Sequence, residues 1–175
     1  MIKGKEDLPS EVSGEISKEM TSLQILEMAI YSEQSACDFY LSLSNQIENQ
    51  SGKEKFRFLA EDEKRHRCML EGEYLRENRQ IVFKFDSTKV KSIKAMADTQ
   101  SSAVDALDLA IGLEREAYKF YTQASEKAED QPGKMMFLKL AEEEDRHYNV
   151  LAAERQALSN NFYWYEYDVP GVMEE

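Results

Sequence analysis

The sequence predicts an all-α protein, a four-helix bundle made of two duplicated antiparallel helical hairpins that a long crossover joins. Three observations predict it. Gly and Pro are scarce, with 7 and 3 residues among 175, so long helices can run without interruption. Apolar residues recur every three or four positions in four segments, which is the period of one helix face. The second half of the chain also repeats the residue order of the first half, as two copies of one structural unit would.

The repeat aligns without a gap when the chain is shifted by 81 residues, and 21 of the 48 positions from Leu26 to Glu73 are identical to their partners. The two copies include "LAEDEKRH" at 59–66 and "LAEEEDRH" at 140–147, which hold the only 2 histidines of the chain. A biased composition would repeat residue types but not their order. A duplicated helical hairpin therefore explains the pattern.

The first repeat covers about 22–78 and the second about 102–159, within a bundle domain predicted at 21–159. In the first helix, Thr21 followed three residues later by Gln24 predicts a capping box at the start. The segments "NQSGK" at 49–53 and "DQPGK" at 130–134 are the expected turns within the hairpins. The helices that flank them are expected at about 53–78 and about 102–128, with the fourth helix repeating the second.

Three segments lie outside the predicted helices. Residues 1–20 form a polar N-terminal segment, and residues 79–101 form a crossover long enough to run the whole length of a bundle. Within the crossover, "IVFKF" at 81–85 alternates like a short extended segment. Residues 160–175 form a tail with an aromatic cluster at 162–167 that includes the only Trp. Such a cluster folds back on the bundle or docks onto a second subunit.

Charge and composition exclude several classes of partner. The net charge is −12, so neither a nucleic-acid backbone nor an anionic membrane surface is an expected partner. No apolar run approaches the length of a membrane span, and the N-terminal residues show no signal peptide. Cys37 and Cys68, the only 2 cysteines, suit a reducing compartment, so we expect a cytoplasmic protein.

Carboxylates and imidazoles interrupt the apolar stripes of all four helices. A buried carboxylate without a partner costs several kcal/mol, and no Lys or Arg lies on these stripes to compensate it. A pair of metal ions would supply the missing positive charge and would also bind imidazole. A Glu and a His three residues apart point the same way from a helix, and the hairpin brings Glu33 and Glu63 to similar heights. The six candidate metal ligands are Glu33, Glu63, His66, Glu114, Glu144 and His147.

This pattern resembles the ferritin-like superfamily of di-iron carboxylate proteins, most closely its rubrerythrin-like branch. In such proteins two helices each supply one Glu, and the other two each supply Glu-x-x-His. The resemblance implies a centre of two iron ions, and Mn or Zn suits the same ligands. It implies that Glu63 and Glu144 bridge the ions, that Glu33 and Glu114 bind one ion each, and that each His caps one ion.

Other residues are expected around the ligands. The resemblance implies that Tyr40 and Tyr121, two turns after the helix glutamates, hydrogen-bond ligand carboxylates, whereas the positions of the other residues follow from helix spacing. Cys37 and Tyr118 are expected at equivalent inward positions, as core packing or alternatively with a redox role. The acidic residues beside the Glu-x-x-His motifs are expected on the outer, solvated face, with Asp62 or Glu143 as alternative partners that orient a histidine.

The function that the resemblance implies is a redox one, of the peroxidase or ferroxidase type. The protein would reduce H2O2 or O2 while Fe(II) is oxidised, and an external electron-donor protein would reduce it again. The sequence departs from rubrerythrin in two ways that bear on peroxidase activity. Its 2 cysteines cannot form a four-cysteine iron site, and Ala117 stands where rubrerythrin has an additional ligand Glu. The alternatives are an iron-binding ferroxidase and storage protein, or a helical interaction module with a structural metal site. A homo-oligomer is expected, most simply a dimer.

Overall fold

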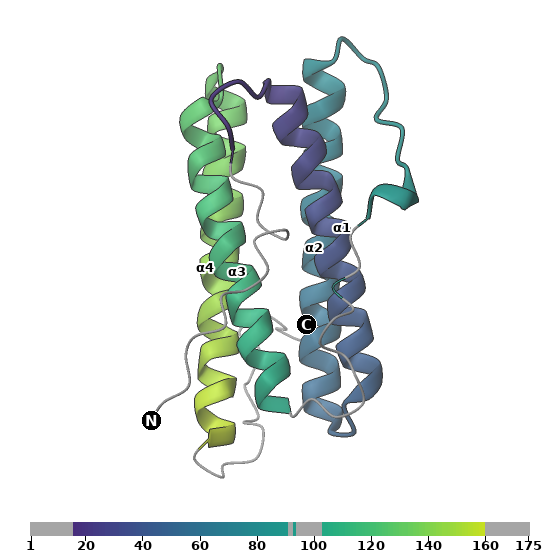
Figure 1. Cartoon of the computed structure of the whole chain (residues 1–175), viewed down its shortest axis with the longest axis vertical. Helices are drawn as coiled ribbons and strands as arrows, with labels where there is room; N and C mark the ends of the chain where they lie inside the picture. The colour runs from purple at the N-terminus through teal and green to yellow at the C-terminus, as the bar shows by residue number, and fades with distance from the viewer. Residues whose placement is uncertain (1–15, 91–92, 94–102, 160–175) are drawn as a thin grey trace, which may run out of the picture.

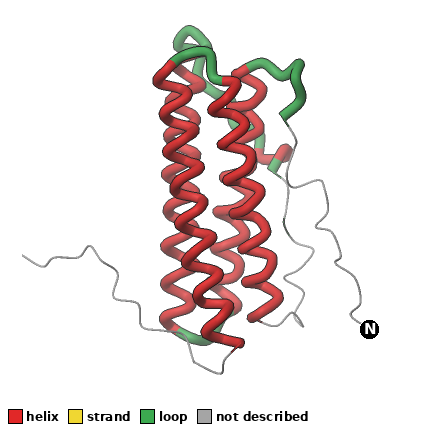
Figure 2. Tube along the Cα trace, turned by 90° about the vertical axis from the view of Figure 1, so that its left-hand side faces the viewer, coloured by secondary structure: helices red, strands yellow, loops and turns green. Residues whose placement is uncertain are grey.

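The structure, a computed structural model, describes residues 16–90, 93 and 103–159 (Figure 1). Its described part contains four long helices and no strand, so the predicted all-α bundle is confirmed. Figure 2 shows the helices side by side along one common axis. None of the described helices is both long and apolar enough to cross a membrane. The elements in order are α1 (Ser22–Gln46), α2 (Gln50–Glu77), the short 3-10 helix η1 (Ser87–Lys89), α3 (Ala103–Lys127) and α4 (Gln131–Ser159).

Side-chain caps define where three of these helices begin. Thr21 and Gln24 form the predicted capping box at the start of α1. Asn49 accepts a hydrogen bond from the backbone N–H of Gly52 at 2.9 Å and so caps α2. Asp130 accepts the equivalent bond from Gly133 at 2.9 Å in the second hairpin. Because a capped N–H needs no other partner, each tight turn leads directly into the next helix.

The helices pack as two hairpins, α1 on α2 and α3 on α4, and the hairpins meet through α1 with α3 and α2 with α4. Two apolar clusters fill the bundle, and the duplication relates them to each other. One cluster includes Leu26, Leu70, Tyr121, Phe137 and Leu140, and the other includes their repeat partners Leu107, Leu151, Tyr40, Phe56 and Leu59. Each cluster thus combines one end of the first hairpin with the opposite end of the second. A pseudo-twofold axis across the middle of the bundle therefore relates the two hairpins.

The crossover leaves α2 at one end of the bundle, and α3 begins at the other end (Figure 1). Two residues with positive φ, Arg79 (49°) and Gln80 (68°), turn the chain after α2. The segment then returns along the outer side of α1, where the backbone N–H of Asp86 donates to the Tyr31 hydroxyl at 3.1 Å. The ring of Phe83 packs on Tyr31 and Tyr74. Residues 81–86 form no regular strand, while residues 1–15, 91–92, 94–102 and 160–175 lie outside the described part.

Candidate metal centre

All six candidate ligands meet at the middle of the bundle, between the two apolar clusters. Each is nearly inaccessible to solvent, with exposed fractions between 0% for His66 and 4% for His147. α1 and α3 each contribute one Glu, and α2 and α4 each contribute a Glu and the His three residues later. The helical period explains this convergence, because the four glutamates continue stripes whose other members are buried Leu, Ile and Phe side chains.

The six residues form two donor groups that share two carboxylates. Glu33, Glu63, His66 and Glu144 form one group, and Glu63, Glu114, Glu144 and His147 form the other; in each, the donor atoms lie within 4.8 Å of one another. The Nδ1 atom of His66 lies 3.1 Å from Oε2 of Glu63 and 3.0 Å from Oε1 of Glu144. The Nδ1 atom of His147 lies 3.3 Å and 3.4 Å from the other oxygens of the same two carboxylates. Glu63 and Glu144 therefore each face both histidines.

The outer nitrogens of the histidines contact carboxylates of the opposite hairpin. Nε2 of His66 lies 2.6 Å from Glu143, and Nε2 of His147 lies 3.1 Å from Asp62. The first expectation for Asp62 and Glu143, an outer solvated position, is wrong: they are 9% and 6% exposed. The alternative expectation matches their contacts, since each carboxylate orients an imidazole so that Nδ1 points inward.

Arg65 links these two outer carboxylates across the hairpins. Its guanidinium lies 3.0 Å from Asp62 and 2.8 Å from Glu143. Its repeat partner Arg146 reaches only Glu143, at 3.6 Å. The Arg65 side chain is 51% exposed, so this is an ion pair at the surface of the bundle. The period of one helix does not tell which side faces the neighbouring hairpin, so the sequence alone does not reveal that Glu143 is one of its partners.

Two buried tyrosines connect the hairpins through the centre. Tyr40 donates its hydroxyl hydrogen to Glu114, and Tyr121 donates to Glu33. A tyrosine two turns from a Glu lies about 10 Å along the same helix, too far to reach it. Helical side chains lean toward the N-terminus, and α1 and α3 run in opposite directions (Figure 1). Each tyrosine therefore meets the Glu of the other hairpin.

The expected equivalence of Cys37 and Tyr118 is wrong. Cys37 is 8% exposed and belongs to one of the apolar clusters, whereas Tyr118 is 43% exposed. Both residues follow a ligand Glu by four positions, at the edge of the inward stripe. Burial at such an edge depends on what lies beside the helix, so the equivalent positions of α1 and α3 differ in burial. Tyr118 is consequently exposed to solvent and is not part of the buried core.

Burial and neighbouring charge shift the pKa values of the carboxyl groups in opposite directions. Burial, together with the charge of Glu63, raises the pKa of Glu33 and of Glu114 well above the ordinary value of 4.5. Burial also acts to raise the pKa of Glu63, but hydrogen bonds from His147 and His66 outweigh it and lower that pKa to about 2. Burial acts to lower the pKa of both imidazoles, yet the surrounding carboxylates raise it above 6.5. Without a metal, these shifts favour the protonated forms of both histidines, Glu33 and Glu114.

Four fully buried ligand atoms of the centre lie near a histidine or a carboxylate but make no contact with hydrogen-bond geometry: Glu33 Oε2, Glu63 Oε1, Glu144 Oε1 and His147 Nδ1. Buried polar atoms in native proteins are normally paired, and an exception calls for an explanation. All four belong to candidate ligands. Carboxylate oxygens and imidazole nitrogens are also the donors that iron, manganese and zinc accept. The residues present thus fit a pair of metal ions.

Comparisons with known proteins identify a family model that matches most of the chain and solved structures with the same fold. A family model for rubrerythrin matches residues 24–155. A hypothetical protein from Pyrococcus furiosus is 27% identical, with a TM-score of 0.67 over 83% of this chain and 95% of that one. A putative ferritin-like diiron-carboxylate protein from Thermotoga maritima is 21% identical, with a TM-score of 0.66 over 81% and 98%.

The same fold occurs in a manganese catalase, KatB from Anabaena, which is 19% identical with a TM-score of 0.62 over 88% of this chain and 78% of that one. None of the proteins with curated descriptions matches the sequence. The expected ferritin-like fold is confirmed by these structures. At this level of identity the catalase supports the fold only.

Proposed function

Since the chain belongs to the rubrerythrin family, we propose that it is a di-iron oxidoreductase that reduces H2O2 or O2 with electrons from an external donor protein. The proposed metal ligands are Glu33, Glu63, His66, Glu114, Glu144 and His147. The observation that carries the proposal is that the two donor groups share Glu63 and Glu144. A shared pair of carboxylates is what two adjacent cations require.

The ligand assignment follows from which atoms face one another. Glu63 and Glu144 present one oxygen to each histidine, so we assign them as bridging ligands. Glu33 lies near His66, at 3.6 Å, and Glu114 lies near His147, at 3.7 Å, so each belongs to one ion. The same arrangement serves manganese, and the ions loaded in the cell decide which metal is present.

The chain's own residues prepare the site for electron transfer to an oxidant. Two ferrous ions, when bound, supply one electron each, and H2O2 with two electrons and two protons becomes two molecules of water. Tyr40 and Tyr121 hold the terminal carboxylates by their hydroxyls, and burial beside those carboxylates raises the pKa of both phenols. They therefore stay neutral and remain donors. Asp62 and Glu143 hold the imidazoles in orientation, and the apolar clusters limit the water on either side.

An external electron donor is part of the proposal because this chain lacks features that support turnover in rubrerythrin. The only 2 cysteines of the sequence cannot form a four-cysteine iron site. Ala117, where rubrerythrin has an additional Glu, offers no seventh ligand. We propose that the centre reacts once with its oxidant and then waits for an electron-carrier protein.

Anaerobic titration tests the proposal. Iron-loaded, reduced protein should consume about one equivalent of H2O2 per metal pair and then stop until a reductant is added. The same protein titrated with O2 shows which oxidant reacts faster. Absence of reaction with both would favour a structural metal site. An assembly of shell-like mass in size-exclusion chromatography, filling with ferric iron, would favour storage instead.

A further inference from the structure

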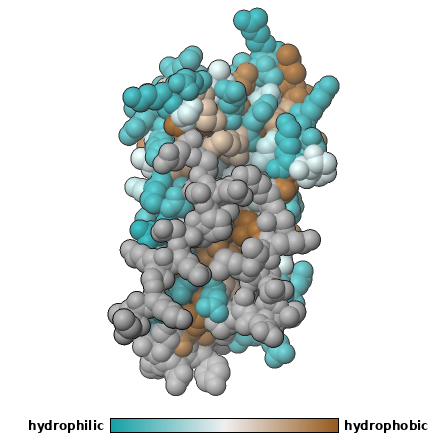
Figure 3. Space-filling view, viewed as in Figure 1, coloured by the Kyte–Doolittle hydropathy of each residue, from teal (hydrophilic) through white to brown (hydrophobic). Residues whose placement is uncertain are grey.

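The loop that follows α2 presents apolar side chains to solvent. Ile81, Val82 and Phe85 are 59%, 69% and 41% exposed. Three cations, Arg79, Lys84 and Lys89, lie among them and are exposed as well. We name these six residues the crossover surface. Figure 3 shows brown and teal atoms intermixed at the upper right, where Figure 1 draws this loop.

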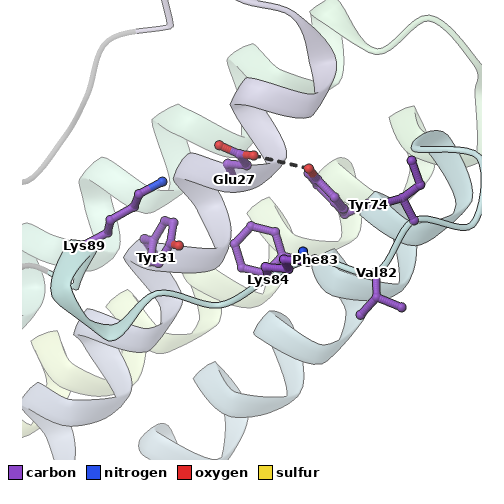
Figure 4. A pocket seen from close by; sticks show the side chains of 8 residues that line it. Glu27, Tyr31, Tyr74, Val82, Phe83, Lys84 and Lys89 are labelled. Carbon is purple, nitrogen blue, oxygen red and sulfur yellow. Dashed lines mark hydrogen bonds between the residues drawn. The ribbon is translucent and has the colours of Figure 1, made fainter.

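A cavity of about 180 Å³ opens in this surface between the loop and α1 (Figure 4). Three aromatic rings form part of its wall, with Phe83 between Tyr31 and Tyr74 at ring-centroid distances of 5.6 Å and 5.1 Å. Glu27 lies in the cavity and accepts a hydrogen bond from the Tyr74 hydroxyl at 3.3 Å. The Nζ atom of Lys89 lies 5.7 Å from the centre of the Tyr31 ring. An aromatic guest with its own N–H or O–H would find ring contacts and an acceptor here.

The charge of the crossover surface contrasts with the rest of the chain. The whole chain carries 34 acidic and 22 basic residues, yet residues 79–89 contain three cations and one carboxylate, Asp86, among these exposed apolar side chains. A complementary partner is therefore acidic and aromatic. One segment of the chain has that composition: residues 160–175, "NNFYWYEYDVPGVMEE", contain five aromatic residues and four acidic ones and no Lys or Arg. We propose that the C-terminal segment of a second copy of this chain docks on the crossover surface.

The distance that the tail can span favours docking on a second copy over docking on the same chain. α4 ends at Ser159, at the same end of the bundle as the turn that follows α1 (Figure 1). Trp164 lies five residues beyond Ser159, which an extended chain spans in about 17 Å. Tyr31, whose ring contacts Phe85 at 5.5 Å, lies fifteen residues before the end of α1, or about 22 Å along the axis. The crossover surface also lies on the other hairpin, so Trp164 of the same chain falls short of it, and among the tail aromatics only Tyr167, eight residues beyond Ser159, could span that axial distance.

Reciprocal docking follows, because each chain has one tail and one crossover surface. Two chains that exchange tails form a closed twofold dimer. An aromatic side chain of the tail enters the cavity, and Glu166 and Asp168 lie close enough in sequence to pair with Lys84 and Lys89. This interaction is independent of the metal chemistry proposed above.

Trp164, the only Trp of the chain, reports docking directly. The metal-loaded full chain should be a dimer in sedimentation equilibrium, with blue-shifted Trp emission that is protected from acrylamide. On dilution, both signals should change over the same concentration range. Lys84→Glu with Lys89→Glu should raise the dimer dissociation constant about tenfold or more, because like charges would then face each other. Lys53→Glu with Lys134→Glu, the same change elsewhere, should leave both signals unaltered.

A mixing experiment separates docking in trans from docking in cis. A chain that ends at Ser159 keeps the surface but has no tail, and the Lys84→Glu/Lys89→Glu chain keeps the tail but has no matching surface. Each alone should be monomeric, with helical circular dichroism like that of the full chain. Mixing them should restore the blue shift and protection of Trp164 and produce a heterodimer.

Three results would overturn the proposal. One is solvent-exposed Trp164 emission in the full chain at every concentration. Another is a dimer that persists without residues 160–175. The third is a buried Trp164 in a monomer, with no recovery on mixing, which would mean that the tail folds on its own chain. If the Lys84→Glu/Lys89→Glu variant loses helical content, Val82→Asp takes its place. This substitution tests the same surface by placing a charge among its apolar side chains.

Discussion

Tyr40 on α1 donates its hydroxyl hydrogen to the carboxylate of Glu114 on α3, across the interface between the two hairpins. Tyr121 and Glu33 repeat the contact in the opposite direction. Both tyrosines are essentially inaccessible, at 0% and 1% exposed. The hairpins are thus joined at the same residues that we propose as terminal metal ligands, so the bundle and the centre depend on each other.

Tyr40→Phe removes that donor and leaves a buried carboxylate short of one hydrogen bond. We expect a loss of about 1–3 kcal/mol in the free energy of unfolding, the cost of such an unsatisfied group. Urea denaturation of the metal-loaded protein measures it. Tyr118→Phe is the matched control, because Tyr118 is 43% exposed, and it should change the unfolding free energy very little. Equal losses in both variants would contradict the role of Tyr40.

Asp62→Ala should weaken metal binding at the ion that His147 binds. The imidazole would lose the carboxylate that orients it, and such partners are worth about tenfold to a hundredfold in affinity. Competition with a chelator measures the two affinities separately. Glu61→Ala, one position earlier and exposed, is the control and should leave both affinities unchanged. If Asp62→Ala also left them unchanged, the contact at 3.1 Å would have no role in metal binding.

The helices and the six-residue cluster could be predicted from the sequence because both depend on short-range periodicity. Glu63 and His66 share a helix face whatever surrounds them, and the duplication at an offset of 81 residues brings the second set to the same level. The capping box at Thr21 is equally local. Features of this kind need only the geometry of a single helix and one turn.

Contacts beside the inward stripe could not be predicted in the same way. Asp62 lies about 100° around the helix from Glu63, and whether that direction faces solvent or α4 depends on how the hairpins pack. The same spacing predicts inward positions for Cys37 and Tyr118, and only the surroundings of α3 leave Tyr118 exposed. The partners of Tyr40 and Tyr121 required the relative direction of α1 and α3.

Metal-free protein should lose stability as the pH rises. The raised pKa values of Glu33 and Glu114 mean that their protons stabilise the fold fully below the ordinary value of 4.5, and this contribution is lost as the pH rises through the folded-state pKa. The pKa values of His66 and His147 are also raised above the ordinary value of 6.5, so the stability that their protons contribute is likewise lost as the pH rises. Glu63 acts oppositely, since its contribution is lost only as the pH falls toward about 2.

Metal binding reverses this dependence because it requires deprotonated ligands. The difference in melting temperature between metal-loaded and metal-free protein should therefore widen from about pH 5.5 to about pH 8. Differential scanning calorimetry at both values measures it. A difference that stays constant or narrows with rising pH would show that the glutamates and histidines do not release protons to bind the metal.

Glu63→Ala should abolish the reaction of the reduced protein with H2O2, since a shared carboxylate serves both ions. Glu61→Ala should leave it nearly unchanged, because Glu61 is exposed and turned away from the centre. Stopped-flow absorbance after loading both variants with the same amount of iron gives the comparison. Equal damage in the two variants would mean that the proposed ligand set is wrong.

X-ray diffraction from metal-loaded crystals at the iron absorption edge tests the central claim most directly. The account predicts two anomalous peaks per chain at the middle of the bundle, one beside Nδ1 of His66 and one beside Nδ1 of His147, with Glu63 and Glu144 between them. A single peak, or peaks that lie away from these six side chains, would contradict it.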